Sequence, residues 1–177
     1  MVVPMATGRV LEIGIGSGSN LPHYGSKVSH LTAIDPLEEL WKKRRLDLSK
    51  LGFDVNYLKG SAEEIPAEDG SFDTVVSTFT LCSVDDIDKV LEEIHRVLKP
   101  GGKLIFSEHG KSPETGTARW QNILNPAWKR ISGGCNLNRD IPAMMKKNGF
   151  RTDHICTQYM PGWRLTSYSY WGSALKI

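Results

Sequence analysis

Long apolar runs are absent from this 177-residue sequence. No stretch approaches the roughly 18 consecutive apolar residues that a membrane-spanning helix requires, so we expect no membrane span. The first residues, MVVPMATGR, also lack the basic and apolar segments of an export signal and the pattern of a transit peptide. Together these absences predict a soluble protein of the cytoplasm.

Cysteine is scarce. Cys82, Cys135 and Cys156 are odd in number, widely spaced, and form neither a CxxC motif nor a Cys/His metal pattern. We therefore expect free thiols, no disulfide framework and no metal site.

A charge excess is missing as well. The 22 basic and 20 acidic residues leave a formal net charge of +2, which is too small for the electrostatic footprint of a nucleic-acid-binding protein. We expect a small-molecule ligand and no nucleic-acid partner. No repeat or low-complexity segment interrupts the sequence, and its length suits one domain.

Strand-type apolar stretches alternate with helix-type stretches through the first two thirds of the sequence. This alternation is typical of an α/β protein with a mostly parallel sheet built from βαβ units. The predicted strands are Arg9–Ile13, His30–Asp35, Phe53–Gly60, Phe72–Ser77, Lys103–His109, Phe150–Tyr159 and Leu165–Trp171.

Helical periodicity is clearest after Asp85, a predicted helix cap. Apolar residues recur there at steps of three and four until Pro100-Gly101-Gly102 ends the pattern: Ile87, Val90, Leu91, Ile94, Val97 and Leu98. Three further helices are predicted, one beginning within Asn20–Tyr24, one over Leu37–Leu51 and one over 140–147.

A glycine-rich turn follows the first predicted strand. Glu12-Ile13-Gly14-Ile15-Gly16-Ser17-Gly18 has the pattern E-x-G-x-G-x-G, and Ser19 stands where a dinucleotide-binding G-x-G-x-x-G turn would need glycine. Glycines allow positive φ angles and let a ligand approach the backbone. The turn is therefore a candidate site for a nucleoside cofactor, although turns also collect glycine without binding anything.

Asp35 ends the second predicted strand, at the edge where doubly wound sheets bind ligands. A carboxylate there can accept hydrogen bonds from both hydroxyls of a ribose, whereas a purely structural role would be a helix cap before Pro36. Ser61-Ala62-Glu63 after the third strand and the segment from Thr78 to Cys82 after the fourth converge on the same crevice.

Five segments resemble successive motifs of class I S-adenosylmethionine-dependent methyltransferases: VLEIGIGSGSNLPHY, the Asp35 position, GSAEEIP, DGSFDTVVSTFTLCSV and HRVLKPGGKLIFSEHG. The segments LCSV, EHG, ARWQNILNPAW and GGCNLNRDIP are similar to bacterial relatives of the alkyl-thiol methyltransferase-like group. The resemblance implies a doubly wound, Rossmann-like methyltransferase fold of seven strands, mostly parallel, with the last strand antiparallel.

The same resemblance implies S-adenosylmethionine as the cofactor and S-adenosylhomocysteine as the product. Gly14, Gly16 and Gly18 would bend around its methionine part, and Asp35 would bind the ribose. Ser61, Ala62 and Glu63 would border the adenine, although many family members carry aspartate at the position of Ser61. The remaining predicted cofactor-binding residues are Glu12, Pro36 and Thr78.

One methyltransferase domain is expected over 1–177, with a cofactor half at about 9–110, a substrate-side insertion at about 111–139, and a closing helix and strands at 140–177. Family members usually carry helices before the first strand, which here begins at Arg9. We hypothesise that the chain is part of a longer protein or that a second copy covers the cofactor in a homodimer.

Methyl transfer needs an oriented acceptor and a water-poor site more than it needs a metal. His109, at the end of the fifth predicted strand, is the candidate general base, and its alternative role is a hydrogen bond to a loop. Cys82 either lines the substrate pocket or is a small buried side chain.

The predicted function is methylation of a small-molecule acceptor: a thiol, an amine or a lipid-like molecule. The alternatives are a cofactor-binding but inactive partner subunit and a nicotinamide-dependent oxidoreductase.

Overall fold

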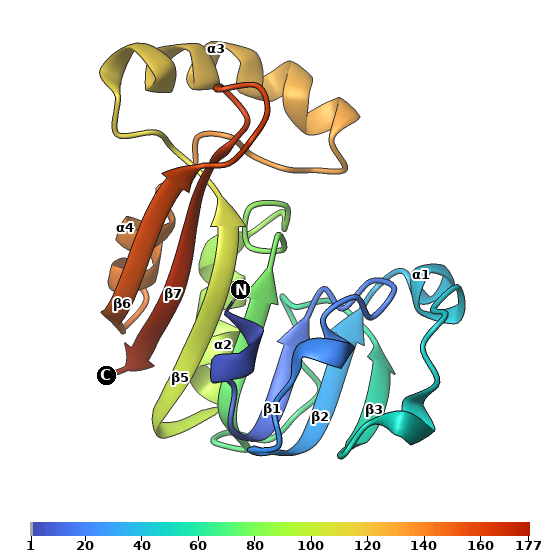
Figure 1. Cartoon of the computed structure of the whole chain (residues 1–177). Coiled ribbons are helices and arrows are strands. Elements are labelled where there is room, and N and C mark those ends of the chain that lie inside the picture. The colour runs from blue at the N-terminus through green and yellow to red at the C-terminus, as the bar shows by residue number, and fades with distance from the viewer. Residues whose placement is uncertain (1) are drawn as a thin grey trace.

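A seven-stranded sheet with the order β3-β2-β1-β4-β5-β7-β6 organises the computed structural model, which describes residues 2–177 (Figure 1). The strands are β1 Gly8–Ile13, β2 Val28–Asp35, β3 Asp54–Lys59, β4 Phe72–Thr78, β5 Leu98–His109, β6 Phe150–Tyr159 and β7 Tyr168–Lys176. Strands β1 to β5 pair in parallel, and β7 runs antiparallel to both β5 and β6. The predicted sheet, with its antiparallel last strand, is confirmed.

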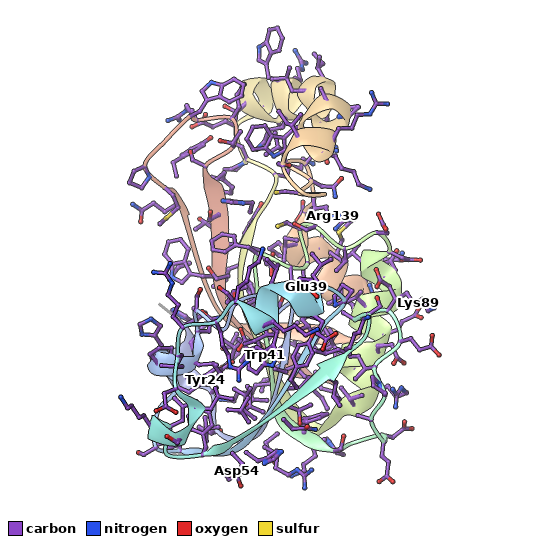
Figure 2. The ribbon with its side chains drawn as sticks, turned by 90° about the vertical axis from the view of Figure 1, so that its right-hand side faces the viewer. Tyr24, Glu39, Trp41, Asp54, Lys89 and Arg139 are labelled. Atoms are coloured by element: carbon purple, nitrogen blue, oxygen red, sulfur yellow. The ribbon has the colours of Figure 1, made fainter. Side chains whose placement is uncertain are left out.

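The helices are α1 Glu38–Lys42, α2 Ile87–Val97, α3 Thr115–Ile131 and α4 Ile141–Lys147, with short 3₁₀ helices at Val3–Met5, Leu21–His23 and Leu48–Lys50. Figure 2 views the molecule from its β3 side, with Tyr24 on one side of the sheet and Lys89 of α2 on the other. Within residues 2–177, none of the helices combines the length and the apolar character needed to cross a membrane.

Each face of the sheet carries its own apolar core. On the α2 face, Val90, Leu91 and Ile94 are fully buried, as the helical periodicity predicted. The opposite face is covered by short segments, and Leu21 and Trp41 are buried there. The long Gly14–Gly18 loop and α1 belong to this more thinly covered side.

The helix predicted over Leu37–Leu51 is wrong, because only Glu38–Lys42 is α-helical. The Arg44 guanidinium lies 4.4 Å from the Trp41 ring and donates to the Trp41 carbonyl, so it caps the end of the helix. Asp47 then accepts a hydrogen bond from the Ser49 N–H and starts a separate 3₁₀ turn. These local side-chain bonds compete with helix continuation.

Several boundaries differ from the sequence prediction. β5 begins at Leu98, five residues before the predicted Lys103, so Leu98 belongs to the strand and not to the helix. Asp86, and not Asp85, is the N-cap of α2, with its carboxylate 3.1 Å from the Lys89 N–H. The last strand begins at Tyr168 and ends at Lys176, which is later along the chain than predicted.

Helix α3 lies beyond the carboxyl ends of the parallel strands β1 to β5, apart from the helices that cover the sheet (Figure 1). Gln121 is its buried residue, and hydrogen bonds of the Gln121 side-chain amide attach the helix to the neighbouring loops. The amide oxygen accepts from the Ser112 N–H at 2.9 Å, and the amide nitrogen donates to the carbonyls of Gly110 and Leu165 at 3.2 and 3.1 Å. Hydrogen bonds, more than the burial of apolar side chains, therefore attach α3 to the rest of the protein.

Candidate active site

The glycine turn after β1 forms the floor of the candidate site. Gly14 and Gly16 have φ angles of 69° and 53°, which favour glycine. A Cβ on Gly14 would lie 2.1 Å from Thr80 Oγ1, whereas a Cβ on Gly16 would meet no atom within 4 Å. Gly14 thus allows the turn to pack against the segment after β4, and Gly16 leaves open space above the backbone.

Asp35 ends β2 beside this turn, and its side chain is buried. Its two carboxylate oxygens accept from the N–H of Gly16 at 2.9 Å and from the N–H of Leu37 at 2.7 Å. A carboxylate has about four acceptor positions, so two remain for a ligand. The predicted pairing of Asp35 with the glycine turn is therefore a direct contact.

Glu12 lies beneath the turn and is buried. Its carboxylate accepts from Asn20 Nδ2 at 2.6 Å and from the Tyr24 hydroxyl at 2.7 Å, and Asn20 Nδ2 also donates to Thr78 Oγ1 at 2.8 Å. Burial raises the pKa of Glu12 to about 7, against the lowering effect of these hydrogen bonds. The carboxylate joins β1, the glycine turn and the end of β4.

Two cavities of about 770 and 550 Å³ open at this edge of the sheet. Gly14, Gly16, Leu40 and Phe79 line both. The smaller cavity brings together most of the predicted nucleoside-binding residues: Asp35, Pro36, Ser61, Ala62 and Glu63. The larger one contains Thr78 and an apolar wall formed by Val2, Val3, Leu40, Met160 and Trp171. Glu12 and Gly18 are the predicted cofactor-binding residues that line neither cavity.

Phe79 lines both cavities and was not identified from the sequence. Its φ of 53° is positive, which is uncommon for a large side chain, and its ring is 52% exposed. The ring centroid lies 4.7 Å from that of His109. No residue spacing indicates a left-handed phenylalanine, so the sequence carried no sign of this position.

Glu108 fixes the backbone around Phe79 and was also missed. Its buried carboxylate accepts from Ser77 Oγ at 2.7 Å and from the N–H groups of Thr80 and Cys82, both at 3.1 Å. Burial raises its pKa. A buried carboxylate with three donors positions the segment that follows β4.

His109, the predicted base, is half-buried at the end of β5 and lines neither cavity. Its Nδ1 lies 3.8 Å from Cys135 Sγ. Cys82 and Cys135 are buried free thiols, and Cys156 is a partly buried one.

Arg139 holds the nearby segment from Leu81 to Asp85 and lies below α3 in the view of Figure 2. Its guanidinium donates to the carbonyls of Leu81 and Val84, each at 2.6 Å. These bonds give Arg139 a structural role on backbone carbonyls.

The strand order, the glycine turn after β1 and the carboxylate after β2 are features of class I S-adenosylmethionine-dependent methyltransferases. A family described as methyltransferase domain matches residues 11–106, more than half of the chain. The protein therefore belongs to the methyltransferase domain family.

Individual relatives agree with this assignment. The human thiol S-methyltransferase TMT1A is 34% identical over 176 residues, covering 94% of this chain and 70% of its own length. The rat thiol S-methyltransferase TMT1B is 39% identical over 147 residues, covering 80% of this chain, which spans 59% of that relative. A crystal structure of a methyltransferase from Methanosarcina mazei has a TM-score of 0.74 at 20% identity, covering 96% of this chain and 92% of its own.

Proposed function

We propose that the protein transfers the methyl group of S-adenosylmethionine to a small-molecule acceptor, with thiols as the first class to test. The observation that carries the proposal is the meeting of Gly16, Asp35 and the segment Ser61–Glu63 around one cavity. Two relatives named thiol S-methyltransferases support the choice of a thiol over an amine or a lipid-like acceptor.

The residues of the smaller cavity fit the nucleoside part of the cofactor. The two free acceptor positions of Asp35 suit the ribose hydroxyls, and the missing Cβ of Gly16 leaves room for close approach to the backbone. The adenine would then be bordered by Ser61, Ala62, Glu63 and Pro36. When bound, S-adenosylmethionine supplies a methyl group already activated by its sulfonium sulfur.

The larger cavity is the proposed acceptor site. Its apolar wall would favour an acceptor with a hydrocarbon part. We propose the segment 111–139 as the substrate-side part of the domain, because α3 lies beyond the carboxyl ends of the parallel strands (Figure 1). Its residues Ser132 and Gly133 line the smaller cavity, and none of its residues lines the larger one. Orientation of the acceptor toward the methyl group is the main task of these residues.

Calorimetric titration of S-adenosylmethionine and S-adenosylhomocysteine into the protein tests the cofactor site. We expect micromolar binding, by analogy with ordinary enzyme affinities, that is lost in Asp35→Ala and Gly16→Val. Asp54→Ala is the matched control for the carboxylate, since Asp54 is exposed at the opposite end of the sheet. Gly101→Val controls for backbone strain, because Gly101 also has a positive φ (72°) but lies at an exposed position of β5, away from the cavities.

Once binding is established, turnover is measured with alkyl thiols, amines and lipid-like acceptors. Methylated product from the unmodified chain, absent in Asp35→Ala, would support the enzyme over an inactive partner subunit. Binding of NAD without binding of S-adenosylmethionine would contradict the proposal.

We also propose that a second copy of the chain covers the cofactor site. Leu37, Leu40 and Phe79 are 60%, 40% and 52% exposed and line the smaller cavity, and apolar side chains grouped in this way favour a protein contact. Sedimentation velocity should give a dimer in the presence of cofactor, and a monomer at all concentrations would contradict this arrangement.

A further inference from the structure

Three metal-binding side chains from separate elements meet next to Phe79. Cys82 follows β4, His109 ends β5 and Cys135 follows α3, and one donor atom of each lies within 4.8 Å of the other two. Cys135 Sγ is 3.7 Å from Cys82 Sγ and 3.8 Å from His109 Nδ1. The two cysteines are 53 residues apart in the chain, so sequence spacing gave no sign of the cluster.

These distances suit one tetrahedral ion. Zinc binds thiolate sulfur at about 2.3 Å and imidazole nitrogen at about 2.0 Å, so two thiolates on one ion lie about 3.8 Å apart and a thiolate and an imidazole nitrogen lie about 3.5 Å apart. The observed separations are 3.7 and 3.8 Å. The third pair of donor atoms, those of Cys82 and His109, lies within 4.8 Å, so a shift of the His109 ring toward Cys82 completes the ligand set.

The backbone around the cluster is held in place. The Asn136 N–H and side-chain amide donate to the Cys82 carbonyl at 2.7 and 3.0 Å, which joins the two cysteine-bearing segments. Glu108 accepts from the Cys82 N–H, and Arg139 binds the carbonyls on either side of that segment. The three donor atoms are therefore gathered by a hydrogen-bonded frame that does not depend on the metal.

We propose that Cys82, His109 and Cys135 bind one thiophilic divalent metal ion of the zinc type, and that its fourth coordination position takes the sulfur of a thiol acceptor. Three protein ligands with an open fourth position are the arrangement of catalytic zinc sites, whereas structural sites have four. His109 is then a metal ligand and not a general base. The acceptor part of this proposal rests on the proposed methyltransferase function, and the metal part does not.

None of the three ligands lines either cavity, but their neighbours do. Phe79, whose ring contacts His109, lines each of them, Ser83 next to Cys82 lines the smaller one, and Ser107 of β5 lines the larger one. A thiol that becomes the fourth ligand releases its proton to solvent. Its sulfur lone pair then forms the new bond to the methyl carbon, while the sulfonium carbon–sulfur bond breaks and leaves its electron pair on the cofactor sulfur.

Cobalt substitution tests the metal site without any need for activity. Chelator-treated, reduced protein is titrated with Co²⁺, and we expect one ion per chain, thiolate-to-cobalt charge-transfer absorption and the intense visible bands of tetrahedral cobalt. Cys135→Ser and His109→Gln should weaken binding by more than the roughly 10- to 100-fold that loss of an outer partner costs. Cys156→Ser should leave the titration unchanged.

Cys156 is the matched control because it has a histidine neighbour of its own: its Sγ lies 3.3 Å from His154 Nε2. Loss of cobalt binding in Cys156→Ser, or absence of stoichiometric binding by the unmodified chain, would overturn the metal site. Oxidation of Cys82 and Cys135 to a disulfide, with no cobalt binding after reduction, would overturn it as well. Urea unfolding of each variant separates lost ligation from lost folding.

An alkyl thiol and the alcohol of the same chain length are then added to the cobalt protein without S-adenosylmethionine. The thiol should change the visible bands and the alcohol should not. If neither changes them, the fourth position does not take the acceptor. If this response appears but no methyl transfer follows, the metal site stands and the proposed function fails.

Discussion

At the scale of single residues, the buried carboxylate of Glu12, beneath the glycine turn, makes the stability of the fold depend on pH. Its pKa of about 7 in the folded protein lies above the ordinary value of 4.5. The folded state therefore holds a proton that the unfolded state has already released between these pH values, and stability falls as pH rises from about 4.5 to about 7.

Replacement of this residue gives a measurable prediction. Glu12→Gln should remove about 2 kcal/mol of the difference in unfolding free energy between pH 5 and pH 8. Urea denaturation at the two pH values checks it, with exposed Glu64→Gln as the control. Glu108 also has a raised pKa and acts in the same direction, so only the comparison of variant with unmodified protein isolates Glu12. An unchanged pH dependence in Glu12→Gln would contradict the role given to this carboxylate.

The sequence predicted the residues of the site unevenly. Asp35 and the glycine turn could be found because strand ends, glycine spacing and ribose chemistry are local properties. Phe79 and Glu108 could not, because their roles come from a left-handed backbone and from three donors that only the fold brings to one carboxylate.

At the scale of elements, the start of α2 distinguishes two adjacent aspartates. Asp86→Ala should lower stability by about 1 kcal/mol, because the N-cap bond to the Lys89 N–H is lost. Asp85→Ala should cost much less, since the 94% exposed Asp85 carboxylate makes only a surface ion pair with Lys129. Thermal unfolding of the two variants compares them, and equal losses would contradict the assignment of Asp86 as the cap.

Strands were easier to predict than the helix after β2. Most residues of β1, β2 and β4 are buried, so their apolar and β-branched residues determine their positions. Over Leu37–Leu51, apolar residues recur with nearly helical spacing, but Arg44 and Asp47 bind the backbone locally and divide the segment. Periodicity alone does not register such competing side-chain bonds.

At the scale of the whole molecule, helices α2 and α3 differ in their attachment. Five apolar residues of α2 are buried against the sheet, whereas the buried residue of α3 is the polar Gln121. Amide hydrogens of α3 should therefore exchange with solvent well before those of α2. Hydrogen–deuterium exchange followed by mass spectrometry tests this order, and equal protection of both helices would contradict it.

The position of β7 has a consequence for how the protein is made. β7 is the last strand along the described chain, yet it lies between β5 and β6 in the sheet. During synthesis, one edge of β5 stays unpaired until β7 has been made. β6 is made before β7 and has no neighbouring strand to pair with until then. An unpaired edge invites pairing with other chains. Deletion of residues 168–177 should therefore remove two strands from the sheet at once and yield aggregates instead of a smaller folded domain.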